Sequence, residues 1–189
     1  MSRIGNRPVY LSDLTAKVEG NSVFIGKDNN FVELKINEGL KIDISDNRFL
    51  RVISLNESSQ KYQGLLRTLI NNAVIGFQSG FSVELDLVGV GYKAEKKGSK
   101  LVLSLGYSHP IEYHLPEGID CVIEKLQKSI QQYQLTITVK GSNKEKVGQV
   151  AADLVSLRVP DAYKGKGIRY ANRPMILKPG KSGPKGSKK

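Results

Sequence analysis

Two apolar stripes of helical period, each preceded by short strand-like runs, constrain the fold of this chain more than any other feature. The first stripe has three- and four-residue spacing and consists of Tyr62, Leu65, Leu66, Leu69, Ile70, Ala73, Val74 and Phe77. It predicts a helix over residues 59–79, with Gly80 as its C-cap. The second stripe follows Ser142–Glu145, which has the spacing of a capping box, and consists of Val147, Val150, Ala151, Leu154 and Val155.

Strand-like runs fill the rest of each half. They lie at residues 22–25, 31–36, 40–44 and 49–55 before the first helix, and at 81–87, 101–105, 111–115, 121–123 and 133–139 after it. Residues 81–87 alternate apolar and polar side chains, which predicts one buried and one solvated face.

The order of these elements predicts an α+β fold. Because a sheet with one apolar face needs a cover, we expect two tandem small domains, each a mostly antiparallel sheet covered by one helix. The expected boundaries are an N-terminal domain at 1–81, a C-terminal domain at 82–178 and a basic flexible tail at 179–189.

Positive charge is concentrated at the C-terminal end. The chain of 189 residues has a net charge of +11, and residues 160–189 contribute +8 of it, from nine Lys and Arg against Asp161. A field of one sign attracts a polyanion, which could be nucleic acid, an anionic membrane or an acidic protein. Composition alone leaves these three classes of partner open.

The residues needed for catalysis or metal binding are sparse. Gly89–Ala94 matches a dinucleotide-binding pattern, but it leads into another strand and opens no helix, so it predicts a hairpin. The two histidines, His109 and His114, lie in a turn composition and on a polar strand face. We therefore expect no enzyme, no metal, no cofactor and no small-molecule substrate. Cys121, within an apolar run, is expected to be a buried hydrophobic residue.

Residues 160–174 combine cations, glycines and aromatic rings. Gly165 and Gly167 allow a backbone to approach a surface closely. The cations suited to phosphate are Lys164, Lys166, Arg169 and Arg173, and the rings suited to stacking on bases are Tyr163 and Tyr170. Since the segment has few apolar residues, we expect an outside partner to order it, with RNA as the favoured partner. A surface loop with incidental lysines is the alternative.

Four separated motifs resemble, in order and spacing, the bacterial-type family of large-subunit ribosomal protein six. They are residues 1–5 (MSRIG), 87–94 (LVGVGYKA), 103–110 (LSLGYSHP) and 160–170 (PDAYKGKGIRY). The resemblance extends to about Lys181. It implies two tandem α+β domains in a non-catalytic protein of the large ribosomal subunit. It also implies binding to large-subunit rRNA near the sarcin-ricin loop and the translation-factor site, with the N-terminal domain towards ribosomal proteins of the stalk base.

The resemblance also implies which residues contact rRNA. Matched by position, they are Arg158, Tyr163, Lys164, Gly165, Lys166, Gly167, Arg169 and Tyr170, with Lys93 and His109 in neighbouring turns. The basic C-terminal segment adds Arg173, Lys178, Lys181 and Lys185. Val155 stands where the family usually has an arginine, and Asp161-Ala162 where it usually has Glu-Pro, so we expect one rRNA contact to be absent. Residues 125–134 are longer than is typical of the family.

The expected location is the ribosome. The abundance of Asn, Lys and Ile is typical of AT-rich coding and favours an organelle, either plastid or mitochondrion, with the bacterial cytoplasm as the alternative. The apolar runs are too short for a bilayer span, and the first residues have no leader composition. A membrane-binding tail would form a helix with a basic face opposite Trp, Phe or Leu, whereas this tail is rich in Gly and Pro. We therefore expect no membrane partner.

Overall fold

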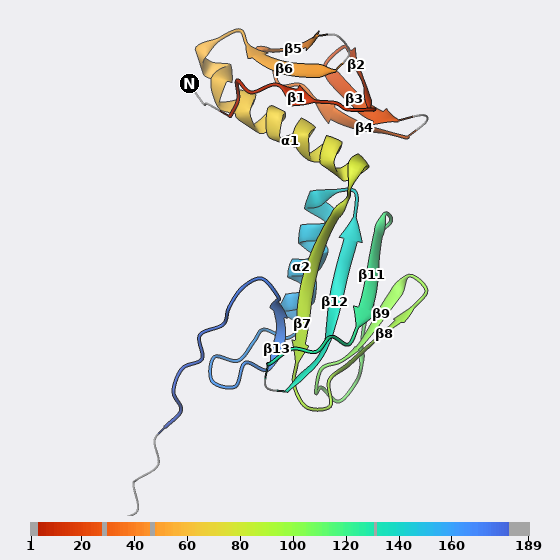
Figure 1. Ribbon diagram of the computed structural model, residues 1–189, viewed down its shortest axis with the longest axis vertical. Helices are drawn as coiled ribbons and strands as arrows, with labels where there is room; N and C mark the ends of the chain where they lie inside the picture. Colours follow the sequence, from red (N-terminus) through yellow and green to blue (C-terminus); the bar gives the residue numbers. More distant parts are fainter. Residues whose placement is uncertain (1–3, 28–29, 46–47, 131, 182–189) are drawn as a thin grey trace, which may run out of the picture. The chain divides into compact units, whose positions relative to one another are not determined.

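The computed structural model describes residues 4–27, 30–45, 48–130 and 132–181, which form two compact units (Figure 1). The N-terminal unit extends to Phe81 and includes Ser142–Lys144, and the C-terminal unit comprises Ser82–Gly141 and the chain from Glu145 onward. Each unit contains antiparallel sheets and one α-helix, so the predicted α+β fold is confirmed. The strands of each unit are divided between two sheets.

The N-terminal unit has two three-stranded sheets. One has the order β1 (Val9–Tyr10), β6 (Phe49–Ser54), β5 (Leu40–Ser45), and the other β2 (Thr15–Glu19), β3 (Ser22–Lys27), β4 (Asn30–Lys35). A 3-10 turn, Glu57–Ser59, leads into α1 (Gln60–Gln78). Strands β1 and β2 were not predicted from the sequence, because β1 has only two residues and β2 exposes four of its five side chains.

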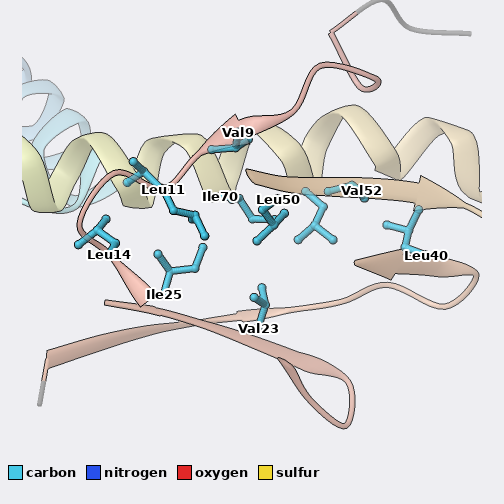
Figure 2. Close-up of a cluster of buried hydrophobic side chains, with 11 residues drawn as sticks. Val9, Leu11, Leu14, Val23, Ile25, Leu40, Leu50, Val52 and Ile70 are labelled. Carbon is cyan, nitrogen blue, oxygen red and sulfur yellow. The ribbon is translucent and has the colours of Figure 1, made fainter. Parts of the chain in front are cut away.

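Helix α1 and both sheets enclose an apolar core. Figure 2 shows Val23 and Ile25 of β3 and Leu50 of β6 converging on Ile70 of α1. A fully buried side chain of this size contributes about 1.5–3 kcal/mol relative to an exposed one. The helix ends at Gln78 with Ser79 as its C-cap, one residue before the predicted Gly80. Gly80 follows with φ +69° and donates its amide to the Ile75 carbonyl at 3.2 Å.

Helix α1 buries only part of its apolar stripe. Leu66 and Ile70 are buried, but Tyr62, Leu65 and Leu69 are 37%, 52% and 39% exposed. The sheets therefore cover only part of the apolar stripe that predicted the helix. Tyr62, Leu65 and Leu69 share one side of the helix, and the apolar arc is wider than the strip that packs on the sheets.

The C-terminal unit has a four-stranded and a three-stranded sheet. The first has the order β11 (Ile119–Glu124), β12 (Tyr133–Gly141), β7 (Phe81–Val88), β13 (Gly167–Tyr170), and the second β10 (Ile111–His114), β9 (Lys100–Ser104), β8 (Lys93–Lys97). Helix α2 (Lys144–Leu157) lies against one face of the four-stranded sheet (Figure 1). Its buried side chains are Val147, Val150, Ala151 and Leu154, as predicted, whereas Val155, the fifth residue of the predicted apolar face, is only partly buried.

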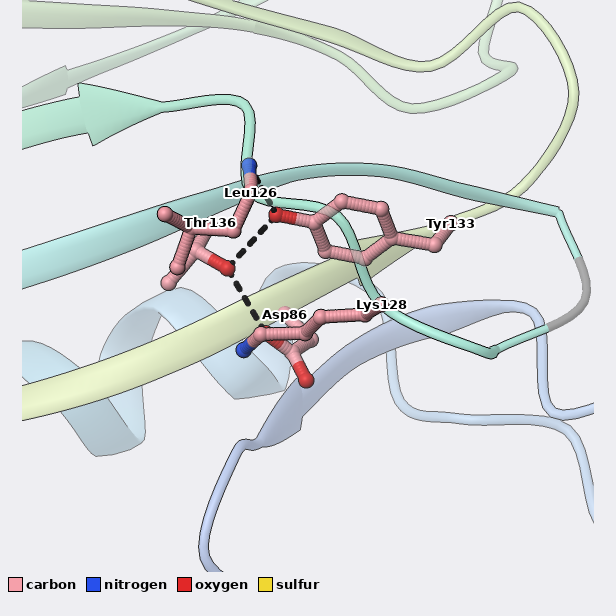
Figure 3. A network of polar contacts seen from close by, with 5 residues as sticks. All are labelled: Asp86, Leu126, Lys128, Tyr133 and Thr136. Atoms are coloured by element: carbon pink, nitrogen blue, oxygen red, sulfur yellow. Dashed lines mark hydrogen bonds and ion pairs between the residues drawn. The ribbon is translucent and has the colours of Figure 1, made fainter.

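Strand β7 departs from its predicted solvated face at Asp86, which is only 2% exposed. The Asp86 carboxylate accepts hydrogen bonds from Lys128 Nζ at 2.6 Å and Thr136 Oγ1 at 2.8 Å. Figure 3 shows Lys128 reaching the carboxylate from the segment between β11 and β12. Alternation in β7 placed Asp86 on the correct side of the strand, but it could not show that another segment covers that side.

Two smaller expectations concern the turn after β7 and the single cysteine. Gly89–Ala94 leads from β7 into β8 and opens no helix, as predicted. Cys121 is 1% exposed, and burial raises the pKa of its thiol to about 11.

Among the described residues, none of the helices is both long and apolar enough for a bilayer span, and no three potential metal-binding side chains are grouped.

Candidate nucleic-acid interface

The basic segment that follows α2 is an integral part of the C-terminal fold. Gly167–Tyr170 forms β13 and pairs antiparallel with β7, so that Ile168 lies opposite Leu87. Ile168 is fully buried, and its amide donates to the Arg158 carbonyl at 2.9 Å. The prediction that an outside partner orders this segment is therefore wrong. One buried isoleucine and the hydrogen-bonding edge of β7 order it within the chain.

Asp161, the single acid of this segment, closes the loop before β13. Its carboxylate accepts the Lys164 amide at 2.8 Å, and its carbonyl accepts the Gly165 amide at 2.8 Å. Its own amide donates to the Lys166 carbonyl at 3.0 Å. The acid thus holds the backbone of the loop that carries both lysines.

Gly167 allows a close approach within the chain itself. Its φ is +147°, and a Cβ at this position would lie 2.7 Å from the Arg158 carbonyl oxygen and 2.8 Å from Pro160 Cα. Only glycine fits this backbone without displacement. The glycine that the sequence analysis assigned to contact with RNA therefore serves the packing of the loop against the end of α2.

Three predicted cations meet in one open hollow of about 580 Å³. Arg158, Lys164 and Lys166 line it, together with Tyr107, Ser156, Leu157, Val159 and Asp161. Arg158 directly follows α2, the lysines come from the closed loop, and Tyr107 lies beyond the end of β9. The three cations exceed the one carboxylate, so the hollow attracts an anionic group such as a phosphate.

The Arg158 guanidinium is held by aromatic side chains. Its Cζ lies 4.7 Å from the ring centroid of Tyr107. Hydrogen bonds with Tyr107 and Tyr92 raise the pKa of Arg158 above its usual range, so it stays cationic. Tyr107 was not among the residues predicted to contact rRNA. Its position within the LSLGYSHP motif, two residues before His109, was the available signal.

Arg169, Arg173 and Lys178 do not belong to the lining of the hollow. Arg169 lies in β13 opposite Asp86, and the Arg173 guanidinium lies 4.9 Å from the ring centroid of Tyr170. The chain then returns to the loop, because the Lys178 amide donates to the Ala162 carbonyl at 2.9 Å.

The other residues predicted to contact rRNA differ in how exposed they are. Tyr163, Lys178 and Lys181 are exposed, Gly165 is buried, and Lys185 lies outside the described residues. Lys93 begins β8 and His109 lies in the turn between β9 and β10. Both are exposed, and neither belongs to the lining of the hollow.

Comparison with known proteins identifies a family. The family model described as Ribosomal protein L6 matches residues 88–171. Curated relatives named "Large ribosomal subunit protein uL6" are 41% identical over 188 residues in Wolinella succinogenes and 43% identical over 187 residues in Campylobacter jejuni and Acidobacterium capsulatum. Each alignment covers 98% of this chain and 100% of the relative. These relatives are bacterial, so the organellar location expected from composition finds no support.

Proposed function

The chain belongs to the ribosomal protein L6 family, and from this premise we propose that its C-terminal unit binds large-subunit rRNA. The protein is a structural component of the large ribosomal subunit and is not an enzyme. The proposed rRNA site lies near the sarcin-ricin loop and the translation-factor site. Its centre is the hollow lined by Arg158, Lys164 and Lys166.

The convergence of these three cations on one open hollow is the observation that carries the proposal. Contacts to phosphate and sugar supply half or more of the hydrogen bonds in typical protein–nucleic acid interfaces, and Lys and Arg are their main donors. Arginine presents a planar fork of N–H donors to phosphate, whereas lysine supplies a mobile point charge. The Arg158 guanidinium beside two lysines therefore suits a nucleic-acid backbone, whose phosphates are closely spaced.

The surrounding residues extend this proposed site. Arg169, Tyr170 and Arg173 continue it along β13 and the residues that follow, and Lys178 and Lys181 continue it into the basic end of the chain. We assign the rRNA contact to a domain spanning residues 82–178 and its tail at 179–189.

A second contact is proposed for the N-terminal domain, residues 1–81, with ribosomal proteins of the stalk base. Support comes from the exposed apolar side chains Tyr62, Leu65 and Leu69 on α1. Grouped exposed apolar residues of this kind are typical of protein contact surfaces.

A salt titration tests the central proposal. The affinity of the full chain for deproteinised large-subunit rRNA of Campylobacter jejuni would be measured over a series of KCl concentrations. Lys164→Ala with Lys166→Ala should flatten the plot of log K against log salt by about 1.4 to 1.8, at roughly 0.7 to 0.9 per phosphate contact. Thermal unfolding should not change, because Lys164 and Lys166 contribute a backbone amide and a backbone carbonyl to the loop, and alanine retains both groups.

The matched control removes the same charge from the other unit. Lys35 and Lys41 are exposed on β4 and β5, and their replacement by Ala should leave the slope unaltered. An unchanged slope in the Lys164/Lys166 variant, or an equal change in the control, contradicts the proposed site.

A further inference from the structure

We propose that Tyr107 is a positioning residue, which holds the guanidinium of Arg158 in the orientation that receives an rRNA phosphate. This inference rests on the proposed function, since it assigns a role within the same hollow. Tyr107 comes from the turn after β9, whereas Arg158 follows α2, fifty-one positions later. The fold thus brings an aromatic ring from the turn between β9 and β10 to the end of α2.

Two contacts fix the tyrosine to the end of α2. The guanidinium carbon of Arg158 lies 4.7 Å from the ring centroid, within the range of a cation–π interaction. The Tyr107 hydroxyl donates to the carbonyl of Leu157 at 3.1 Å. Leu157 is the last residue of α2 and directly precedes Arg158, so one side chain holds both the backbone and the charged end of this junction.

Tyr92 supports the arginine from a second element. It lies in the turn between β7 and β8, is 7% exposed, and its phenol, after that of Tyr107, helps to raise the pKa of Arg158. Tyr107 is 49% exposed and belongs to the lining of the hollow. The guanidinium therefore lies against a half-exposed phenol ring, while Arg158 still lines the hollow beside Lys164 and Lys166.

Restraint of this kind matters for binding. A long arginine side chain loses rotamer freedom when it meets a phosphate, and that loss weakens binding unless the side chain is already ordered. The two lysines of the hollow have no aromatic contact of this kind among the described residues. Removal of the Tyr107 ring should therefore weaken rRNA binding by roughly three- to tenfold, through Arg158 alone.

A double-mutant cycle separates this role from direct contact with RNA. The variants are Tyr107→Leu, Arg158→Gln and their combination, measured as the full chain with deproteinised large-subunit rRNA of Campylobacter jejuni. Arg158→Gln should flatten the salt plot by about 0.7 to 0.9. Tyr107→Leu should weaken binding in the wild-type background, and should have less than about a twofold effect once Arg158 is replaced.

Tyr107→Phe provides a variant that keeps the ring beneath the guanidinium and removes only the hydroxyl contact with Leu157. It should retain more affinity than Tyr107→Leu, and its effect should also vanish in the Arg158→Gln background. If Tyr107→Leu fails to fold, as judged by thermal unfolding, the Phe variant completes the cycle.

The outcomes distinguish the two proposals. Equal weakening by the Tyr107 variants in both backgrounds overturns the positioning role, because it means that the ring contacts RNA or supports the fold independently of Arg158. If Lys164→Ala with Lys166→Ala flattens the salt plot while the cycle shows no coupling, the proposed function stands and this inference fails. If the lysine variant leaves the salt plot unchanged, the proposed function itself fails.

Discussion

The two units of the molecule share an order of elements but differ in the polar groups that they bury. In the described N-terminal unit the buried polar side chains are Ser59 and Gln63, both neutral. Gln63 Nε2 donates to the Val52 carbonyl at 2.8 Å, and Ser59 Oγ donates to the Gly39 carbonyl at 2.9 Å. The C-terminal unit instead buries a carboxylic acid, Asp86. Similar secondary structure thus encloses interiors that are stabilised in different ways.

The acid in the C-terminal unit is part of a hydrogen-bonded network (Figure 3). Thr136 Oγ1 donates to Asp86, Tyr133 Oη lies 2.8 Å from Thr136 Oγ1, and the Leu126 amide donates to Tyr133 Oη at 3.1 Å. Lys128 Nζ supplies the opposite charge. A buried charge is costly unless it is paired and hydrogen-bonded. The residues between β11 and β12 therefore stabilise the strand on which β13 pairs.

The largest expected loss of stability comes from truncating a side chain in the apolar core of the N-terminal unit. Ile70→Ala should lower the free energy of unfolding by about 4 kcal/mol, because Ile70 is fully buried in the N-terminal core and its truncation leaves a cavity. Equilibrium urea unfolding of the full chain measures the loss. The control is Leu65→Ala on the same helix, where the side chain is half exposed and the loss should stay below about 1 kcal/mol. Similar losses for both variants would show that the exposed side of α1 is also packed.

The next largest loss of stability should come from removing the counter-charge of the buried Asp86 carboxylate. Lys128→Met leaves the Asp86 carboxylate without its counter-charge and should destabilise the chain by about 3 kcal/mol in the same urea measurement. Lys125→Met removes an equal charge from an exposed position of the same segment and should change stability by less than about 0.5 kcal/mol.

A second substitution checks the cause. Adding Asp86→Leu to Lys128→Met should restore part of the lost stability, because an apolar pair replaces a buried unpaired charge. If the double variant is less stable than Lys128→Met alone, the carboxylate stabilises the unit through Thr136 rather than through its charge pair.

The smallest effects compare the two helices through their interior glycines. A Cβ at Gly76 in α1 would lie 2.1 Å from the Ser142 carbonyl oxygen, whereas a Cβ at Gly148 in α2 meets nothing within 4 Å. Gly76→Ala should therefore destabilise by about 2 kcal/mol through overpacking. Gly148→Ala should stabilise by about 0.5–1 kcal/mol, because alanine loses less backbone entropy in a helix. Thermal unfolding midpoints should move in opposite directions, and a shared direction would contradict the difference in packing.

The sequence by itself determined the features that depend on neighbouring residues. Helical spacing predicted α1 at 59–79, and the structure has it at Gln60–Gln78. The concentration of cations after residue 160, and the selection of Arg158, Lys164 and Lys166, also came from the sequence and its family resemblance. These features were accessible because helix periodicity and charge density are local properties of the chain.

The tertiary structure alone decided which of these residues meet and which faces are covered. Strand β13 exists because its backbone pairs with β7, about eighty residues earlier, and its composition contains no signal for that pairing. The burial of Asp86 depends on Lys128 from another connection, and the hollow depends on Tyr107 arriving from beyond β9. Likewise, Leu65 and Leu66 are adjacent leucines of one stripe, yet only Leu66 is buried. Strand pairing and burial are set by contacts between distant segments, so the local pattern of side chains could not specify them.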